Sequence, residues 1–284
     1  MTLIVSWVAT DDKPEGKKIS SVYFCADSRI SWTAYGKVYD MGKKVYACKD
    51  YPEIFCFCGD VDFPTGTLQS LIAEIDNGLL FDANSPFDQK KAMIADFVRQ
   101  SLQQYPKDVL RQTFKIYYAS CIGNSFYMAK FAYDGNDYLV EDVDLPAQST
   151  KVFSDGSGKE LFETLWGEAD RDCVNEQNTS RNVYNCFSHT IDEASKYPKD
   201  RNLCMVGGAP QLVGLYRKSG TKLFGIVKNG ERYIQGRRVD FNPCLNNIEW
   251  RNDNFERVNP QTMELLNGAQ PQPFAPREWR VSKP

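Results

Sequence analysis

The N-terminal part of the chain consists of short apolar runs separated by polar turns, which is the pattern of β-strands. The first run begins at Leu3, and the turn Lys13-Pro14-Glu15-Gly16 joins it to residues 19–29, so the two segments are predicted to form a hairpin. Residues 54–58 are apolar at every position, which predicts a strand that is covered on both faces. Two further short strands, predicted to pair with each other, are residues 37–39 and 44–48.

Helical periodicity follows in the middle of the chain. Residues 67–75 and 87–105 are amphipathic, and the second segment carries apolar residues at helical spacing, namely Met93, Ile94, Phe97, Val98 and Leu102. Ser85-Pro86 is predicted to cap this second helix and open its first turn, and Pro106 ends it. Two more helices are predicted, one from residue 159 and one over residues 183–195. The remaining strands are predicted over residues 114–121, 126–133, 138–143, 151–158, 203–206, 211–217 and 223–235.

The order of these segments is a β-rich block, two helices, a second β-rich block, two helices and closing strands. Such blocks favour an α+β arrangement of two sheets stacked face to face with a helix pair outside each, over strict alternation of strand and helix. The polar residues 170–182 are predicted to be a surface insertion. We expect one domain over residues 1–240 and a C-terminal extension, residues 241–284, packed on the same domain, because the chain after Asn242 is rich in Asn, Pro and Gln.

The composition is that of a globular protein. Of the 284 residues, 42 % are hydrophobic and 25 % are charged, which argues against disorder. The 34 basic residues are balanced by 37 acidic ones, and the net charge of −3 disfavours a nucleic-acid-binding surface. Nothing resembles a signal peptide, and no apolar stretch approaches the roughly 20 residues of a membrane span. We therefore expect a cytoplasmic protein with no membrane and no nucleic-acid partner.

The cysteines and the histidine do not indicate a metal site. The nine cysteines are odd in number and spread over strands and helices, which fits buried thiols in a reducing compartment better than a disulfide framework. Cys56-Phe57-Cys58 has the wrong spacing for a zinc knuckle and, on a strand, places both thiols on one face, so core packing is predicted. The single histidine, His189, is predicted to be an ordinary helix residue. We expect no metal and no cofactor.

Chemistry is suggested first by the start of the chain, Met1-Thr2-Leu3-Ile4-Val5-Ser6. If Met1 is removed, Thr2 carries a nucleophilic hydroxyl and a terminal amine with an unperturbed pKa of roughly 7.7–8.0, so that nucleophile and base lie on one residue. A threonine after the initiator is common, however, and ordinary N-terminal processing explains it without any chemistry. The significance of Thr2 therefore depends on the rest of the chain.

Further short motifs follow in order along the predicted strands and helices. They are Ala26-Asp27-Ser28-Arg29, Lys43-Lys44-Val45, Cys58-Gly59-Asp60, Gly156-Ser157-Gly158 and Gly207-Gly208-Ala209. Each is weak by itself, but their order after the N-terminal run resembles N-terminal-nucleophile (Ntn) hydrolases of the proteasome β-subunit class. This class includes the bacterial proteasome-like peptidase that works with a ring-shaped unfoldase. The resemblance covers residues 2–235.

The resemblance implies a four-layer αββα sandwich and a threonine-type amide hydrolase. It also implies a homo-oligomeric ring, a peptide or protein substrate, and an ATPase unfoldase as a potential partner. Thr2 would attack a carbonyl through Oγ while its amine, directly or through a water, accepts the proton. Lys44 would supply positive charge that keeps the amine neutral, and Asp27 would orient Lys44. The N–H of Gly59 would donate to the oxyanion, and Ser157 would hydrogen-bond the amine.

Each of these residues also has a purely structural explanation. Asp27 would serve as a turn or cap residue, Lys44 as an exposed strand-edge residue, Gly59 as a backbone requirement and Ser157 as a helix cap. Retention of Met1 would remove the proposed chemistry altogether, because Thr2 would then have no free amine.

The chain also departs from the family pattern. Many active members carry an acidic residue and a serine just before the Gly-Gly pair, where they support the serine of the Gly-Ser-Gly loop. This chain has Leu203-Cys204-Met205-Val206 at that place, with Asp200 and Asn202 a little upstream. Two rival functions therefore stay open. One is a catalytically silent structural or binding subunit with the proteasome fold, and the other is an Ntn amidase that acts on a small molecule.

Overall fold

The computed structural model describes residues 2–14, 16–32, 35–106, 113–172, 179–196 and 205–269, and for residues 168–172 it describes the backbone alone. Within these ranges the chain is a mixed α/β protein with two large, mainly antiparallel sheets and four α-helices. Met1, Asp200, Asn202, Leu203 and Cys204, which the sequence analysis singled out, lie outside the described residues, as do residues 270–284 of the predicted extension.

The larger sheet is built around an N-terminal hairpin. β1 (Leu3–Lys13) and β2 (Gly16–Ala26) are antiparallel, with Lys13 opposite Gly16 at the turn, which confirms the predicted hairpin. The strands follow one another in the order β10, β1, β2, β11, β12, β13 and β14. Beyond this path β15 runs parallel to β12, and β16 pairs with β15. The bounds are β10 (Thr150–Gly156), β11 (Gln211–Tyr216), β12 (Gly220–Lys228), β13 (Glu231–Ile234), β14 (Arg237–Arg238), β15 (Glu249–Arg251) and β16 (Arg257–Val258).

The second sheet contains β6 (Glu53–Gly59), the strand that was predicted to be covered on both faces. The strand order is β5 (Val45–Ala47), β6, β7 (Phe114–Ile122), β8 (Ser125–Tyr133) and β9 (Tyr138–Asp142). The first six residues of β6 are all buried, which confirms the prediction. Because successive side chains of a strand point to opposite faces, Phe55 and Phe57 pack on one side, and Ile54 and Cys56 pack on the other.

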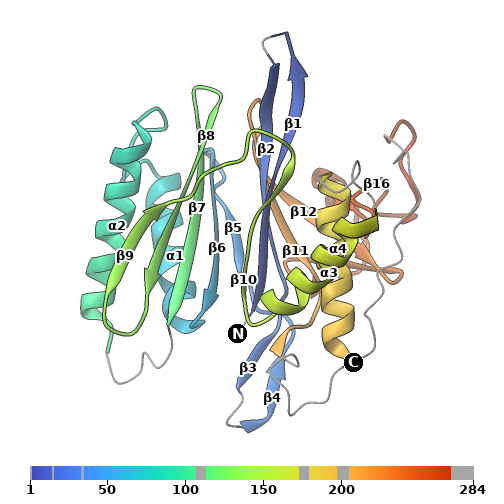
Figure 1. Cartoon of the computed structure of the whole chain (residues 1–284), viewed down its shortest axis with the longest axis horizontal. Coiled ribbons are helices and arrows are strands. Elements are labelled where there is room, and N and C mark those ends of the chain that lie inside the picture. The colour runs from blue at the N-terminus through green and yellow to red at the C-terminus, as the bar shows by residue number, and fades with distance from the viewer. Residues whose placement is uncertain are drawn as a thin grey trace.

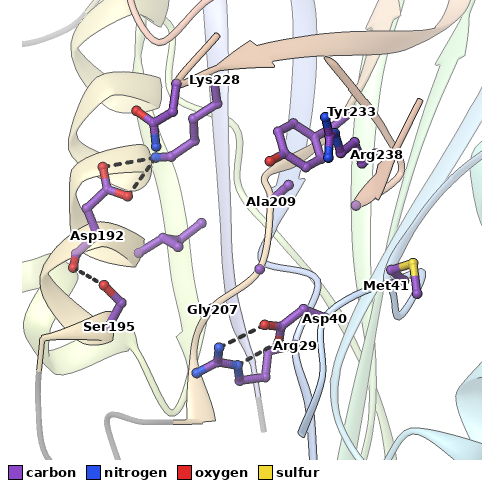
Figure 2. Close-up of a pocket in the computed structure, with 14 residues that line it drawn as sticks. Arg29, Asp40, Met41, Asp192, Ser195, Gly207, Ala209, Lys228, Tyr233 and Arg238 are labelled. Carbon is purple, nitrogen blue, oxygen red and sulfur yellow. Dashed lines mark hydrogen bonds and ion pairs between the residues drawn. The ribbon is translucent and has the colours of Figure 1, made fainter. Parts of the chain in front are cut away.

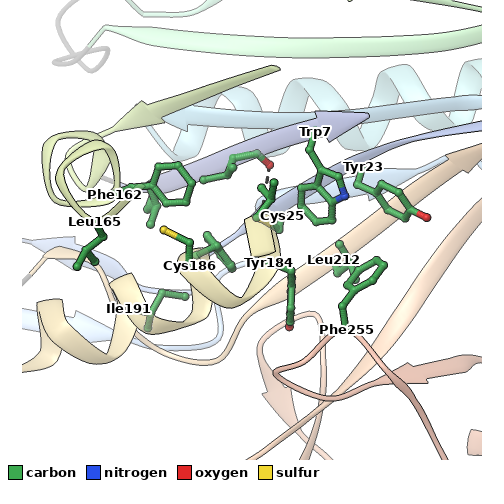
Figure 3. Packing of buried hydrophobic residues seen from close by; sticks show 14 of the residues in the cluster. Trp7, Tyr23, Cys25, Phe162, Leu165, Tyr184, Cys186, Ile191, Leu212 and Phe255 are labelled. Atoms are coloured by element: carbon green, nitrogen blue, oxygen red, sulfur yellow. Dashed lines mark hydrogen bonds between the residues drawn. The ribbon is translucent and has the colours of Figure 1, made fainter. Parts of the chain in front are cut away.

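The helices cover the outer faces of the two sheets. Figure 1 shows α1 (Asp62–Asp76) and α2 (Phe87–Gln104) beside the second sheet and α3 (Lys159–Asp172) and α4 (Ser180–Ser195) beside the larger one, with the sheets facing each other between them. One apolar cluster joins α1 and α2 to the second sheet, and another lies between the sheets. A third, in which Trp7, Phe162 and Tyr184 take part, lies under α3 and α4 (Figure 3). No helix in the described ranges combines the length and apolar character that crossing a bilayer requires.

Several local predictions are wrong. Residues 37–39 form β4 (Lys37–Tyr39), which pairs with β3 (Ile30–Trp32) and not with β5. The reason is burial, because β4 is exposed at every residue whereas Val45 and Tyr46 of β5 are buried. Ser85 does not cap α2, since the residue that flanks the helix is Pro86, in an extended conformation and without a side-chain cap.

The described parts of the predicted insertion (residues 170–182) and of the predicted extension (residues 241–284) contain more helix and strand than the sequence indicated. Residues 170–172 continue α3 and residues 180–182 open α4, so helix occupies both ends of the predicted insertion. Met205 and Val206, the described half of the predicted strand 203–206, are not in a strand. The described part of the extension contains the 3₁₀ helix η3 (Pro243–Asn247) and strands β15 and β16. The division into a domain and an extension stays a prediction.

Candidate active site

Thr2 lies immediately before β1 and is fully buried. Its backbone N–H donates to Ser157 Oγ at 3.2 Å, and its carbonyl oxygen accepts from Ser157 Oγ and from the Gly158 N–H, each at 3.4 Å. Among the described residues, the Thr2 hydroxyl oxygen Oγ1 has no hydrogen-bond partner. A buried hydroxyl without a partner costs free energy. The contacts with Ser157 and Gly158 therefore hold the backbone of Thr2 and leave its hydroxyl group uncommitted.

Two glycines allow the loop after β10 to reach Thr2. Gly156 lies opposite Leu3 and has a φ of 92°, a backbone conformation that favours glycine. A Cβ atom at Gly156 would lie 1.9 Å from the Thr2 carbonyl oxygen, and one at Gly158 would lie 2.9 Å from the Leu3 Cβ. Neither position has room for a side chain, so the glycines on both sides of Ser157 bring it onto Thr2.

Asp27 and Lys44 form a buried ion pair next to Thr2. Asp27 follows the last residue of β2 and Lys44 precedes β5, so the two sheets contribute one partner each. Lys44 Nζ lies 2.8 Å from Asp27 Oδ1, and neither side chain is exposed. The alternative explanation of Lys44 as an exposed strand-edge residue is therefore wrong. Burial lowers the pKa of Lys44, and the charge of Asp27 opposes that effect.

Backbone N–H groups complete the surroundings of the Asp27 carboxylate. Oδ1 also accepts from the Leu3 N–H at 2.9 Å, and Oδ2 accepts from the N–H groups of Gly207 at 3.0 Å and Arg29 at 3.2 Å. The bond to Arg29 is the turn contact that the structural explanation of Asp27 predicts. The bond to Leu3 ties the ion pair to the residue directly after Thr2.

Gln211 is a polar residue of this region that the sequence analysis missed. It is fully buried at the start of β11, where its Oε1 accepts from the Lys44 N–H at 3.0 Å. Its Nε2 donates to the carbonyl oxygens of Gly42 at 2.6 Å and Asp27 at 3.2 Å. Gln211 thus fixes the backbone on both sides of the ion pair. The available signal was a glutamine that opens an otherwise apolar strand, Gln-Leu-Val-Gly-Leu-Tyr.

Gly59 ends β6, opposite Phe114 of β7. Its φ is 99°, and a Cβ atom there would lie 2.1 Å from the Thr113 carbonyl oxygen. The backbone therefore requires glycine at this position, as the structural explanation of Gly59 states. The role of its N–H toward an oxyanion stays a prediction.

The cysteine pair is confirmed as core packing. Cys56 and Cys58 are buried in the cluster between the sheets. Burial raises the pKa of the Cys58 thiol to about 12 and that of Cys56 well above its ordinary range, so neither is a thiolate at neutral pH.

His189 lies on α4 with Nε2 3.4 Å from Glu193 Oε1. His189 is thus on a helix, as predicted.

A cavity of about 420 Å³ lies beside the ion pair, and Gly207 and Arg29 are among the residues that line it (Figure 2). The guanidinium of Arg29 forms a two-point ion pair with Asp40, with Nε 2.7 Å from Oδ1 and Nη2 2.9 Å from Oδ2. Lys228 Nζ lies 2.9 Å from Asp192 Oδ1 on the opposite wall. These lining charges thus neutralise one another in pairs, and the residues grouped around Thr2 do not line the cavity.

The structure therefore brings four of the five predicted residues into one bonded group, in which Thr2 contacts Ser157 and Asp27 contacts both Lys44 and Leu3. The fifth residue, Gly59, ends strand β6 of the second sheet. The residue before it, Cys58, lies close to the loop that carries Ser157, because a Cβ atom placed on Gly156 would be 3.6 Å from the Cys58 Cβ. Thr2 thus combines a buried hydroxyl without a partner with a neighbouring residue, Leu3, whose N–H binds a buried ion pair, an arrangement that suits nucleophilic attack.

Comparison with known proteins shows similarity in fold. No protein-family model and no curated protein sequence match the chain. Among solved structures, the chain is similar to Anbu (ancestral beta-subunit) from Yersinia bercovieri, with a TM-score of 0.50 and 12 % sequence identity. The match covers 75 % of this chain and 81 % of that chain. At this identity the similarity concerns the fold alone.

Proposed function

We propose that the chain is a threonine-type amide hydrolase of the Ntn class, in which Thr2 becomes the terminal nucleophile once Met1 is removed. The observation that carries the proposal is the buried Asp27–Lys44 ion pair, which is bonded to the residue after Thr2. A role in stability alone explains a deeply buried ion pair poorly, because replacing such a pair by apolar residues is often neutral or stabilising. Buried charges beside a nucleophile are typical of active sites.

In the proposed reaction, Oγ1 of Thr2 attacks the carbonyl carbon of an amide, and the free amine of Thr2 accepts the hydroxyl proton directly or through a water. Cleavage of the C–N bond transfers this proton to the leaving amine and leaves an ester on Thr2. Water then hydrolyses the ester and restores the hydroxyl. Ser157, whose Oγ lies 3.2 Å from the Thr2 nitrogen, holds the amine in place.

Lys44 supplies the positive charge of the proposed site. Its ammonium group has three N–H bonds, and among the described residues it has two acceptors, Asp27 Oδ1 and the Arg29 carbonyl oxygen at 2.5 Å. We assign to the positive charge of Lys44 the role of favouring a neutral Thr2 amine and a developing alkoxide. The Gly59 N–H keeps its role as the predicted donor to the oxyanion.

The proposal extends to fold class and assembly. We assign the four-layer αββα sandwich to residues 1–240, with copies of the chain joined in a ring in the cytoplasm. Peptides or proteins are the proposed substrates, and an ATPase unfoldase is the proposed partner. The order of the helix pairs and sheets in Figure 1 and the fold similarity to a protein named as an ancestral β-subunit support this extension.

The decisive experiment compares wild type with Thr2→Ala and with Thr2→Ser, which keeps a hydroxyl at the same position. Intact-mass measurement first establishes that Met1 has been removed. Hydrolysis of fluorogenic peptides and covalent labelling by a threonine-directed electrophile are then measured for the three proteins. Activity and labelling are expected in wild type, reduced activity in Thr2→Ser, and neither in Thr2→Ala. Equal signals from wild type and Thr2→Ala would refute the threonine mechanism.

The same preparations separate the rival functions. Retained Met1 together with an assembled but inactive protein would identify a catalytically silent subunit. Hydrolysis of simple amides but not of peptides by a small oligomer would identify an amidase. Molar mass from light scattering gives the oligomeric state, and a monomer at working concentration would contradict the proposed ring.

A further inference from the structure

The proposed site is divided between the two sheets. Thr2, Asp27 and Ser157 belong to strands of the larger sheet or to the loops at their ends, whereas Lys44 and Gly59 belong to the second sheet. The distance between nucleophile and oxyanion donor therefore depends on how the sheets are held together at this end. A misplacement of about 1 Å in an active site can reduce the rate about 100-fold.

Asp155 of β10 makes a contact between the sheets at this place. Its Oδ2 accepts from Tyr117 Oη at 2.6 Å and from Lys115 Nζ at 2.7 Å, both on β7. Its Oδ1 accepts from Lys115 Nζ at 3.0 Å and from the Gly156 N–H at 2.7 Å. One carboxylate thus binds two side chains of the second sheet and the backbone of the loop that contains Ser157.

The register of the strands shows what this contact connects. Asp155 lies opposite Ile4 and Gly156 opposite Leu3, which places the carboxylate two residues from Thr2 along β1. Lys115 lies opposite Cys58, next to Gly59. A stacked pair of rings, Tyr117 on Phe153 with centroids 3.9 Å apart, lies across the same boundary.

We propose that Asp155 is a positioning residue, which acts through Lys115 and Tyr117 to set the placement of Thr2 and Ser157 relative to Gly59. This inference rests on the proposed function. The carboxylate does not touch the reacting atoms, and its effect is transmitted by the Gly156 backbone and the β7 side chains.

The charges favour the contact at neutral pH. Burial alone would raise the pKa of Asp155, but the hydrogen bonds from Lys115 and Tyr117 outweigh burial and hold this pKa below its ordinary value. Burial and the neighbouring carboxylate raise the pKa of Tyr117, so the phenol keeps its proton and donates it. At neutral pH the Asp155 carboxylate is therefore charged and the Tyr117 phenol is protonated, as their hydrogen bond requires.

Glu163 of α3 provides a matched control. Its carboxylate also binds one lysine and one hydroxyl group, those of Lys151 and Ser154, and both lie on the same strand, β10. Glu163 connects β10 to the outer helix and not to the second sheet. Loss of either carboxylate removes hydrogen bonds from β10, but of the two only Asp155 is bonded to side chains of the second sheet.

The test compares Asp155→Asn, the milder Tyr117→Phe and the control Glu163→Gln with wild type. Hydrolysis of a fluorogenic peptide gives kcat and KM, and hydrogen–deuterium exchange is measured for peptides that cover residues 2–5, 57–60 and 154–158. We expect kcat to fall about 10–100-fold in Asp155→Asn and less in Tyr117→Phe, with KM changed less than about twofold. Exchange should become faster in the three segments in Asp155→Asn, whereas Glu163→Gln should leave kcat and the exchange of residues 2–5 and 57–60 as in wild type.

The outcomes separate this inference from the proposed function. If wild type shows Thr2-dependent hydrolysis and kcat is unchanged in Asp155→Asn and Tyr117→Phe, the positioning role is overturned. If wild type is inactive, the proposed function fails, and exchange alone decides the role of the contact. Faster exchange on both sides of the sheet boundary would then support a positioning role, and unchanged exchange would overturn it. Tyr117→Phe removes a single hydroxyl group and provides the same test if Asp155→Asn does not fold.

Discussion

Removal of the buried cation from the Asp27–Lys44 pair tests how the candidate site is held together. In Lys44→Met the Asp27 carboxylate stays buried without its counter-ion, and breaking a buried pair in this way costs about 3–5 kcal/mol of unfolding free energy. Three backbone N–H groups, those of Leu3, Arg29 and Gly207, still donate to the carboxylate and stabilise its charge. We therefore expect a loss at the lower end of this range, about 3 kcal/mol.

The reciprocal change, Asp27→Asn, is expected to cost more. Four N–H donors surround the two carboxylate oxygens, and an asparagine side chain accepts hydrogen bonds at one of its two ends only. At least one buried donor then loses its acceptor, which adds about 1–3 kcal/mol to the loss of the pair. In the double variant both charges are absent, so its loss should be smaller than the sum of the single losses by about 1–3 kcal/mol.

The assay is urea unfolding followed by tryptophan fluorescence at pH 7. Protein concentration is held constant, because assembly makes apparent stability depend on it. Lys91→Met is the matched control, since Lys91 pairs with the exposed carboxylates of Asp88 and Asp142 and its removal should cost less than about 1 kcal/mol. Equal losses of unfolding free energy in Lys44→Met and Lys91→Met would refute the reasoning. So would a loss in the Asp27–Lys44 double variant that equals the sum of the two single losses within about 0.5 kcal/mol.

Three further predictions follow from individual residues. Gly59→Ala combines backbone strain with a contact of 2.1 Å to a carbonyl oxygen and should lower the unfolding free energy by at least about 2 kcal/mol; a melting temperature equal to that of wild type contradicts this. Lys90→Met leaves Glu53 buried without its cation and should lower the unfolding free energy by about 3–5 kcal/mol, most of which the added change Glu53→Leu should restore. Urea unfolding in which the double variant is less stable than Lys90→Met contradicts this. Because the pKa of Asp155 is lowered in the folded state, its charge stabilises the fold above its ordinary pKa of 3.8. The stability difference between wild type and Asp155→Asn should therefore shrink below that pH in thermal melts, and a difference that grows on acidification excludes this.

The long periodic segments of the fold were predictable from the sequence, because burial imposes its period on the residues themselves. β6 is apolar at each position from Ile54 to Cys58 since both of its faces are covered, and α2 carries its apolar residues on one face. Three-residue strands carry no such period. The pairing of β4 with β3 depended on which segment is exposed and which is buried, and that is a property of the whole fold.

The candidate site was likewise predictable in part from the sequence and in part not. The sequence by itself indicated the candidate residues, because Thr2, Asp27, Lys44, Gly59 and Ser157 stand in short motifs whose order is visible along the chain. The tertiary structure decided which groups complete the site. Gln211 lies 167 positions from Lys44 and reaches it because β11 of the larger sheet packs against β5 of the second, and Asp155 reaches β7 across the same boundary between the sheets. Such contacts join distant segments through sheet pairing and packing, and no local pattern of residues encodes them.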